Sequence, residues 1–521
     1  MNQSKLFATL AVALATAALP QMLRAEQPDP DRYIVKHHAG KGAEARAAMT
    51  KSRGRIAHEL PAHDAVAMHL DAASHVELSR NPHIAYIERD VPRYPMALDA
   101  PSTGAPYAAG QKVPYGISMV QADQLSDALA GNRKVCIIDS GYQLAHEDLS
   151  ANNVTGTNDS GTGLWSTDEN HHGTHVAGTI AAINNAGTGV VGVNPNKTLN
   201  LHIIKVFNAS GWAYSSTLTA AVDKCAAAGA NVISMSLGGG ASSRTEKAAF
   251  DKYYTRATNS ILSIAAAGNA GTTAVSYPAG YTNVVSVAAV DVNKAWATFS
   301  QYNSDVELAG PGVGVLSTVP MGTGRGSVFS VGGAGYGSLP MDGSPIGSVS
   351  GALVDCGTGA AVCAGAAGKV CLIQRGANAF ADKVLNCQNG GGTAAAVYNN
   401  VAGILSGTMG TTATSIPSVG ISDVDGAALK AGSIGAAAST AVTATNYAYF
   451  DGTSMATPHV SAVAALVWSY RPSCNAATLR SVLNATAQDL GGASRDTKFG
   501  FGLVQALAAK NRLVSAAVSC P

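Results

Sequence analysis

The stretch VCIIDSG, at residues 135–141, opens with four consecutive apolar residues and ends with an acid, a serine and a glycine. A strand that is apolar on both faces is typical of a parallel sheet covered by helices on both sides, because neither of its faces meets water. Such sheets place binding and catalytic residues at the carboxyl ends of their strands. The stretch therefore predicts an α/β domain and makes Asp139 the first candidate functional residue.

Similar apolar runs recur along the chain and alternate with alanine-rich segments that suit helices. Further strands are expected at residues 201–207, 232–236, 261–266 and 284–289. Helices are expected at residues 175–183, 216–228 and 454–470. This alternation predicts a three-layer domain, in which a parallel sheet lies between two layers of helices.

The alternation stops at residues 321–445 and resumes after them. This segment is rich in Gly, Ala and Ser and holds four of the eight cysteines. It contains short β-like runs at 369–374 and 394–398, with a helical stretch at 379–386 between them. Because the α/β pattern continues on both sides, an inserted β-rich domain explains the segment better than two domains in series.

The chain begins with a segment typical of export. Lys5 precedes an uncharged apolar run at residues 6–19, and Ala25 offers a small residue for cleavage. The run is shorter than the roughly 20 residues that span a bilayer, which favours a signal peptide at residues 1–25 over a membrane anchor. We therefore expect a secreted protein with no stable membrane anchor, in which disulfides can form.

A small α+β unit is expected next. Residues 32–36 form a strand-like run, residues 42–53 a charged helical stretch, and residues 84–88 a second extended run. Four prolines then fall between residues 92 and 106 in a stretch of small residues. Such a stretch predicts an exposed linker, which is where proteases cut.

The composition narrows the classes of function. A chain of 521 residues can hold two to four folded units. Charged residues make up only 13% of it, against about 25% in typical domains, and the formal net charge is +1. Charge this sparse and balanced predicts neither a basic face for nucleic acid nor an acidic tail.

Eight cysteines in an exported chain allow four disulfides, with 105 ways to pair them. Zinc binding is the alternative, but there is no CxxC pair and the spacings are irregular. Pairing between neighbours in the sequence is favoured, and the remaining two cysteines then form the fourth bond. The predicted bonds are Cys356–Cys363, Cys371–Cys387, Cys474–Cys520 and Cys136–Cys225.

Three motifs carry the candidate chemistry: residues 135–141, HGTHVAGT at 172–179, and GTSMATPH at 452–459. Each alone has an ordinary structural explanation, since an Asp often caps a strand and a Ser often caps a helix. Together they supply an acid, a histidine and a serine. A serine nucleophile needs a base within hydrogen-bond reach and a carboxylate that orients the base.

In this order, Asp then His then Ser, the motifs resemble the subtilisin family of serine proteases. The resemblance spans residues 111–319 and 446–504 and implies that Asp139 orients the general base His172. It implies that Ser454 is the nucleophile, whose position at a helix start lies in the positive end of the helix dipole.

The family resemblance also assigns an oxyanion hole. Asn269, in the run AAGN at 266–269, matches the family's donor to the developing oxyanion, together with the backbone N–H of Ser454. The same resemblance implies that His175, in the motif of His172, and His459, in the motif of Ser454, are structural residues.

Substrate-binding residues follow from the same resemblance. Ser236, Leu237 and Gly238 match the strand that pairs with an extended peptide through main-chain hydrogen bonds. Residues 265–268, which include Ala266 and Gly268, are expected to form the wall of the primary pocket. Its floor is expected near Ser276. None of these residues is charged, so we expect apolar or aromatic residues before the cut. Tyr214 resembles the residue that lines a further subsite.

A structural calcium ion is also implied by the resemblance, since oxygen donors in such a set suit this cation. The loop that contains Thr188 is about one residue longer than the common form, and an ordinary glycine-rich turn is the alternative. The matching positions are Gln111, Asp148, Ile183, Asn185, Thr188 and Val190.

Two further units resemble known domains. Residues 321–445 resemble a protease-associated domain through the run GKVCLIQRG at 368–376, which implies a role in substrate access or self-association. Residues 26–96 resemble an inhibitor-type pro-domain, which assists folding and blocks the site until it is cut away. The subtilisin-like peptidase domain is then 97–521, interrupted by the insertion, and it acts on protein or peptide substrates.

The sequence disfavours three other functions. A secreted binding module with a decayed site is disfavoured because all four catalytic positions hold competent residues. A lipase or esterase would carry Gly-x-Ser-x-Gly, whereas Ser454 lies in Gly-Thr-Ser-Met-Ala. Metal-dependent or transglycosylase-like hydrolysis is disfavoured because the sequence has neither a His-Glu-x-x-His helix nor paired carboxylates.

Overall fold

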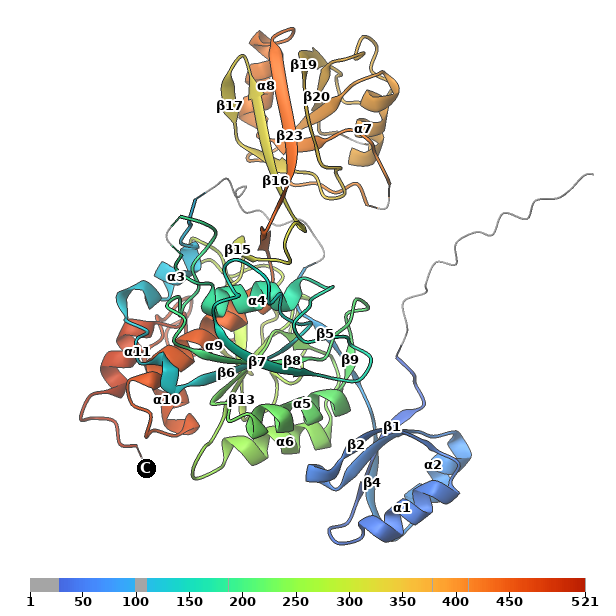
Figure 1. Ribbon diagram of the computed structural model, residues 1–521, viewed down its shortest axis with the longest axis vertical. Helices are drawn as coiled ribbons and strands as arrows, with labels where there is room; N and C mark the ends of the chain where they lie inside the picture. The colour runs from blue at the N-terminus through green and yellow to red at the C-terminus, as the bar shows by residue number, and fades with distance from the viewer. Residues whose placement is uncertain (1–27, 99–109, 186, 377, 411, 521) are drawn as a thin grey trace, which may run out of the picture.

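Seven parallel strands form the central sheet of the computed structural model, which describes residues 28–98, 110–185, 187–376, 378–410 and 412–520 (Figure 1). The order is β14-β13-β12-β10-β6-β8-β7, and every neighbouring pair is parallel. The strands are β6 (Lys134–Asp139), β7 (Asn153–Asn158), β8 (Asn200–Lys205), β10 (Val232–Met235), β12 (Leu262–Ala266), β13 (Val284–Val290) and β14 (Val306–Pro311).

Alternate residues of these strands pack into two different cores. Ile137 belongs to the core shared with α4, α9, α10 and α11, whereas Ile138 belongs to the core shared with α5 and α6. This explains the continuous apolar run and confirms the predicted three-layer α/β domain. The helices are α4 (His172–Ala181), α5 (Ser215–Ala227), α6 (Arg244–Tyr254), α9 (Thr453–Ser469), α10 (Ala476–Thr486) and α11 (Ala506–Leu513), with a short α3 (Tyr115–Met119).

The predicted helix at 175–183 begins earlier, at His172. The reason is a cap that precedes it, because Asp168 accepts hydrogen bonds from the backbone N–H groups of His171 and Thr174, at 3.0 and 2.8 Å. A carboxylate there satisfies donors that the first helical turn leaves unpaired.

The inserted segment forms its own eight-stranded mixed sheet, in the order β17-β16-β23-β19-β20-β21-β22-β18. Its two long strands β16 and β23 rise directly from the antiparallel pair β15 and β24 of the peptidase body (Figure 1). The bounds are β15 (Val315–Thr318), β16 (Gly324–Val331), β17 (Ala334–Tyr336), β18 (Ser338–Pro340), β19 (Gly347–Asp355), β20 (Val370–Gln374), α7 (Phe380–Asn389), β21 (Ala394–Tyr398), β22 (Ser418–Ile421), α8 (Asp423–Gly432), β23 (Ala437–Thr445) and β24 (Tyr447–Phe450).

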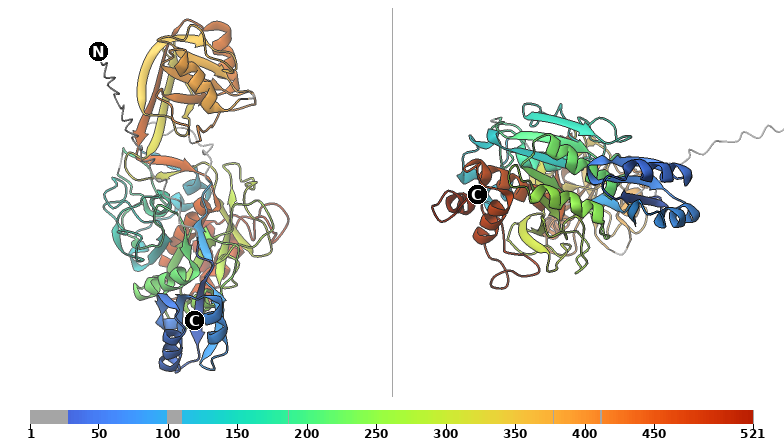
Figure 2. Two further views of the ribbon diagram at one scale, coloured as in Figure 1. Left: turned by 90° about the vertical axis from the view of Figure 1, so that its right-hand side faces the viewer. Right: turned by 90° about the horizontal axis from the view of Figure 1, so that it is seen from below.

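The N-terminal unit is a four-stranded antiparallel sheet in the order β2-β3-β1-β4, with two helices on one face. Its other face packs on the peptidase body, where Ala220 of α5 contacts its small apolar cluster. The unit and the insert lie at opposite ends of the molecule (Figure 2). The elements are β1 (Arg32–His37), α1 (Gly42–Lys51), β2 (Arg55–Leu60), β3 (Ala65–His69), α2 (Ala72–Ser79) and β4 (Ile84–Arg89).

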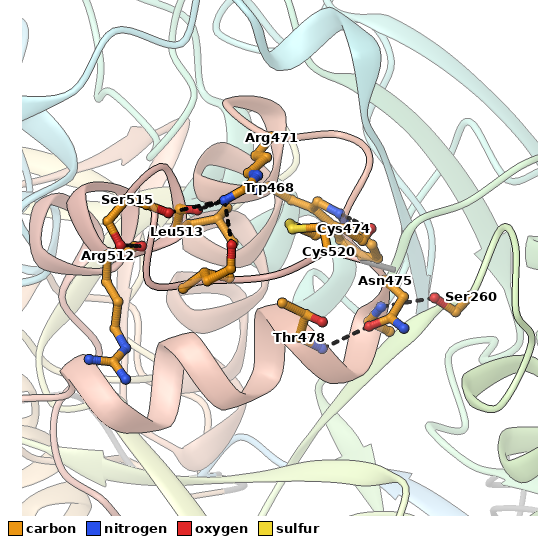
Figure 3. The surroundings of a disulfide bond; sticks show 12 residues. Ser260, Trp468, Arg471, Cys474, Asn475, Thr478, Arg512, Leu513, Ser515 and Cys520 are labelled. Atoms are coloured by element: carbon orange, nitrogen blue, oxygen red, sulfur yellow. Dashed lines mark hydrogen bonds between the residues drawn. A yellow bond between two sulfur atoms is a disulfide. The ribbon is translucent and has the colours of Figure 1, made fainter.

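All four predicted disulfides are present. The Cys474–Cys520 bond ties the end of the chain to the loop between α9 and α10 (Figure 3). Beside it, Arg471 Nη1 donates to the carbonyls of Leu513, the last residue of α11, and of Ser515 and Val518, which follow the helix. The bond to Leu513 is 2.9 Å long. Since every cysteine is bonded, no thiolate remains for zinc.

Two earlier expectations concern the ends of the chain and its hydrophobic segments. The predicted signal peptide at 1–25 and residues 99–109 of the linker lie outside the described residues. Within the described part of the chain, no helix has the length and apolar character needed to cross a bilayer.

Candidate active site

The acid, the histidine and the serine of the three motifs lie at the ends of three elements. Asp139 is the last residue of β6, His172 is the first residue of α4, and Ser454 is the second residue of α9. All three are buried, and His172 Nδ1 donates a hydrogen bond of 2.7 Å to Asp139 Oδ1. This bond fixes which ring nitrogen carries the proton and leaves Nε2 to act as a base.

The carboxylate also sets the proton affinity of the ring. Burial opposes a charged imidazolium, but the charge of Asp139 and its hydrogen bond outweigh burial and raise the pKa of His172 above its ordinary value. No described protein group bonds to His172 Nε2. The ring is therefore oriented through Nδ1, while the buried Nε2 has no hydrogen-bond partner among the described residues.

The hydroxyl of Ser454 points to a main-chain acceptor. Ser454 Oγ donates to the carbonyl of Ser236 at 2.9 Å rather than to His172. Ser236 Oγ in turn donates to the Ser454 carbonyl at 2.8 Å. That second bond replaces the helical N–H that Pro458 cannot provide four residues later, so a proline is tolerated in α9.

Asn269 lies where the family resemblance expects an oxyanion donor. Its Oδ1 accepts hydrogen bonds from the backbone N–H and the hydroxyl of Thr453, at 2.9 and 2.8 Å. Both acceptor positions are thereby used by Thr453, and the amide nitrogen is left to donate. It donates to the carbonyl oxygen of Met96 at 2.5 Å, and the backbone N–H of Ser454 donates to the same oxygen at 3.2 Å.

The segment around Met96 therefore lies in the site as a substrate would. Strand β5 (Pro92–Pro95) is the middle strand of the antiparallel sheet β11-β5-β9, between β11 (Leu237–Gly238) and β9 (Ala213–Tyr214). Met96 N–H donates to the Ser236 carbonyl at 3.0 Å, and Leu98 N–H donates to the Asp451 carbonyl at 2.9 Å. The Met96–Ala97 peptide bond thus lies beside Ser454, and Ala97 lines a hollow together with His172.

Of the predicted pocket residues, Gly238 lies against the Met96 side chain and next to Ser276. A Cβ added to Gly238 would lie 2.9 Å from Met96 Cε and would overlap Ser276 Oγ. Gly268, with φ of +111°, donates its N–H to Thr453 Oγ1, and Ala266 ends β12 in the buried wall nearby. No charged side chain is among these predicted pocket residues.

Tyr214 lies further along the same segment. It pairs with Pro92 across β9 and β5, and its hydroxyl accepts the N–H of Asp29 at 2.8 Å. The ring also stacks under the guanidinium of Arg32, at 3.9 Å from the ring centroid. Tyr214 therefore contacts both the segment that lies in the site (residues 92–98, called the bound segment below) and the N-terminal unit.

Two acids of the N-terminal unit cap helices of the peptidase body. Glu88 accepts the backbone N–H groups of Arg244 and Thr245 at the start of α6, at 2.8 and 3.0 Å. Asp90 accepts the N–H of Ser216 at the start of α5, at 2.9 Å. Carboxylates at helix N-termini are stabilising, so these contacts hold the N-terminal unit over both helices.

The predicted calcium residues also come together, except for Thr188. Asp148 is buried and accepts from Asn185 Nδ2 at 2.5 Å and from the Val190 N–H at 2.8 Å, while Gln111 lies 3.5 Å from the Ile183 carbonyl. Burial raises the pKa of Asp148 above its ordinary value. Carboxylate, amide and carbonyl oxygens gathered around a buried acid fit a hard cation. Thr188 lies exposed in the same loop.

The two neighbouring histidines belong to the packing. His175 stacks on Phe450 at 4.3 Å, and burial lowers its pKa to about 3. His459 donates from Nδ1 to the Met455 carbonyl, and burial lowers its pKa to about 4. Both rings are neutral near neutral pH.

Comparison with known proteins agrees with this geometry. A family model described as the subtilase family matches residues 131–330 and 392–502. The chain belongs to the subtilase family. Subtilisin DY of Bacillus licheniformis is 43% identical over 219 residues, which cover 41% of this chain and 77% of that protein. Subtilisin NAT of Bacillus subtilis subsp. natto is 34% identical over 331 residues, or 61% of this chain and 82% of that protein.

A solved structure extends the likeness. The psychrophilic subtilisin-like protease from Pseudoalteromonas sp. AS-11 matches with a TM-score of 0.63 at 46% identity, covering 79% of this chain and 100% of that one. These findings confirm that the protein is a serine endopeptidase of the subtilisin family. A PA domain model matches residues 349–429, which confirms the protease-associated domain in the insertion.

Sequence reasoning missed residues of the segment that lies in the site, and a residue that contacts it. Met96 and Arg93 carried no motif, and Glu246, which holds Arg93, lies on an ordinary charged helix. Only the fold brings residues so distant in the sequence to the same cleft. The prolines at 92 and 95 predicted an exposed linker, and this was wrong for residues 92–95, which form β5 between β9 and β11 with Arg93 buried.

Proposed function

We propose that this subtilase is exported as a precursor, cuts its own Met96–Ala97 bond, and then hydrolyses peptide bonds of other proteins outside the cell. The observation that carries the proposal is the Met96 carbonyl, which accepts from both Asn269 Nδ2 and the Ser454 N–H. Residues 1–25 are the signal peptide, 26–96 the inhibitory pro-domain, and 97–521 the mature enzyme with its insert at 321–445.

The chemistry follows from the positions of the groups. Ser454 Oγ turns from the Ser236 carbonyl toward His172 Nε2, loses its proton to that nitrogen and attacks the carbonyl carbon. The two donors stabilise the negative charge that develops on the carbonyl oxygen. His172 then passes the proton to the leaving nitrogen of the residue after the cut, and Asp139 stabilises the imidazolium in between. This leaves an ester between Ser454 and the residue before the cut. A water that gives its proton to His172 attacks this ester, and the proton returns to Ser454 Oγ as the acid product leaves.

We call residues 92–96 the pro-segment. Substrates bind as this pro-segment does, as an extended strand between β11 and β9. Main-chain hydrogen bonds to Ser236 and its neighbours supply sequence-independent affinity. The uncharged pocket next to Gly238 and Ser276 selects an apolar side chain such as that of Met96. We therefore propose broad specificity with apolar or aromatic residues before the cut.

The insert is proposed to restrict access to the part of the cleft that binds residues after the cut, or to mediate self-association. Its support is the link through β24, because Phe450 at the end of that strand lines the hollow shared by His172 and Ala97. The next residue, Asp451, provides the carbonyl that accepts from Leu98.

Serine-directed labelling tests the function. The mature protein should digest casein, and a fluorophosphonate should abolish digestion while it modifies Ser454, as read by mass spectrometry of the labelled peptide. Ser454 is expected to react because the proposed mechanism gives it His172 as a base and two donors for the oxyanion. A protein that neither digests casein nor takes the label would instead be a binding module with an inert site.

A calcium ion is proposed to stabilise the fold through Asp148, Gln111, Asn185 and the carbonyls of Ile183 and Val190. A cation that binds only the folded state at a hundredfold excess over its Kd adds about 2.7 kcal/mol. Chelation should therefore lower the melting temperature of the mature protein in thermal unfolding. Asp148→Asn should remove the calcium response, whereas Asp382→Asn, which changes an exposed acid in the insert, should keep it. A melting temperature independent of calcium would contradict the site.

A further inference from the structure

The most deeply buried ion pair between the pro-segment and the peptidase body lies three residues before Met96. Arg93 Nε and Nη2 donate to the two carboxylate oxygens of Glu246, at 2.9 and 2.5 Å. The exposed fractions of the two side chains are 1% and 0%. Two parallel bonds to one carboxylate fit the planar guanidinium and no other side chain.

Glu246 is not explained by its place in the helix. It is the third residue of α6, whose N-cap is Ser243, and a glutamate there commonly bonds back to the N–H of the cap residue. In this chain the Ser243 N–H donates instead to the Tyr281 hydroxyl, at 2.8 Å. The carboxylate of Glu246 is thus left to face the cleft.

The surroundings hold this carboxylate in place without the arginine. Tyr281 donates its hydroxyl to Glu246 Oε2 at 2.6 Å, and the first turn of α6 places the positive end of the helix dipole beside it. Among the described residues, Arg93 is the one cation that forms an ion pair with Glu246. When the pro-domain leaves, the subsite keeps an oriented negative charge that faces the substrate strand.

We propose that Glu246 is a specificity-determining residue that selects an arginine at the fourth residue before the cut. The proposal rests on the proposed function, because it takes the pro-segment as a substrate bound across the site. A neutral side chain at that position would bury the carboxylate without a cationic partner, and a lysine could satisfy it through a single point charge only. Within its broad specificity, the mature enzyme should therefore cleave fastest the peptides that combine this arginine with an apolar residue immediately before the cut.

The first test uses the mature wild-type enzyme and blocked peptide anilides X-Tyr-Pro-Met, where X is arginine, lysine or norleucine. We expect kcat/KM for the arginine peptide to exceed that for the norleucine peptide by about 30-fold or more, with lysine between them. Equal values for arginine and norleucine would overturn the proposal. Casein digestion without an arginine preference would overturn this inference alone, whereas cleavage of neither casein nor peptides would overturn the proposed function with it.

The second test assigns the preference to Glu246. Glu246→Gln alone would leave Arg93 buried without its partner in the precursor, so it is combined with Arg93→Met, a residue that is lost on processing. The mature enzyme then differs from the wild type at position 246 only. We expect an arginine-to-norleucine ratio near one, while the matched control Asp382→Asn keeps the wild-type ratio. A wild-type ratio in the Glu246→Gln enzyme would show that another residue selects the arginine.

Discussion

Replacement of Ser454 by alanine should leave the precursor intact at the Met96–Ala97 bond and abolish digestion of casein. In subtilisin itself, loss of the nucleophile lowers kcat by about 10⁶-fold, and a loss of that size removes any detectable self-cleavage. The Met96–Ala97 bond already lies in the site, with its carbonyl held by Asn269 and the Ser454 N–H, so the variant lacks only the nucleophile. Intact mass and N-terminal sequencing of the purified protein measure the result: the wild type should begin at Ala97, and the variant before it.

A matched control separates self-cleavage from a folding defect. Ser348→Ala changes an exposed serine of the insert and should be processed as the wild type is. The Ser454→Ala precursor should also melt cooperatively, because the interface that includes Glu88 and Asp90 is untouched. Appearance of Ala97 as the N-terminus of the purified Ser454→Ala protein would assign the processing to another protease.

The sequence predicted the sheet and its motifs because the signals there are local. Continuous apolar runs such as 135–138 must be buried on both faces, and the structure places Ile137 and Ile138 in two different cores. The acid at the end of β6 follows from the same pattern. The Cys356–Cys363 and Cys371–Cys387 pairs were predicted correctly for a similar reason, since only 7 and 16 positions separate the partners.

The rest depended on contacts that no local pattern encodes. The pair of Arg93 and Glu246 joins residues that are 153 positions apart, and each reads in the sequence as an ordinary charged residue. The same holds for Met96, which reaches the oxyanion donors only because β5 lies between β9 and β11. The start of α4 was misplaced because the cap comes from Asp168, four residues earlier, and not from the residue next to the helix.

The catalytic histidine and its acid depend on both local motifs and contacts between distant residues. The motifs identified Asp139 and His172, but not the environment that sets the pKa of the ring. The processing proposed above would remove the residues up to Met96 but would leave Asp139 beside the ring. The raised pKa of His172 is therefore kept in the mature enzyme, because its cause, Asp139, remains.

Replacement of Asp139 by asparagine should lower kcat by about 10⁴-fold at neutral pH, with little change in KM. An amide at this position can present a donor to His172 Nδ1, which favours the wrong tautomer and removes the negative charge that stabilises the imidazolium. KM should change little because Asp139 is buried behind the ring and does not contact the bound segment. Steady-state hydrolysis of a peptide anilide by processed enzyme measures both constants, and processing can be supplied by added wild-type enzyme.

The pH profile gives a second readout with a definite sign. The wild-type base must be neutral, so activity is lost as the pH falls through the pKa of His172, which Asp139 holds above the ordinary value of about 6.5. Without the carboxylate that cause is gone, and the acid limb of kcat/KM for Asp139→Asn should move to lower pH. A limb that stays in place in the variant, or wild-type activity that remains flat down to about pH 4, would mean that His172 is not the base whose protonation controls the rate.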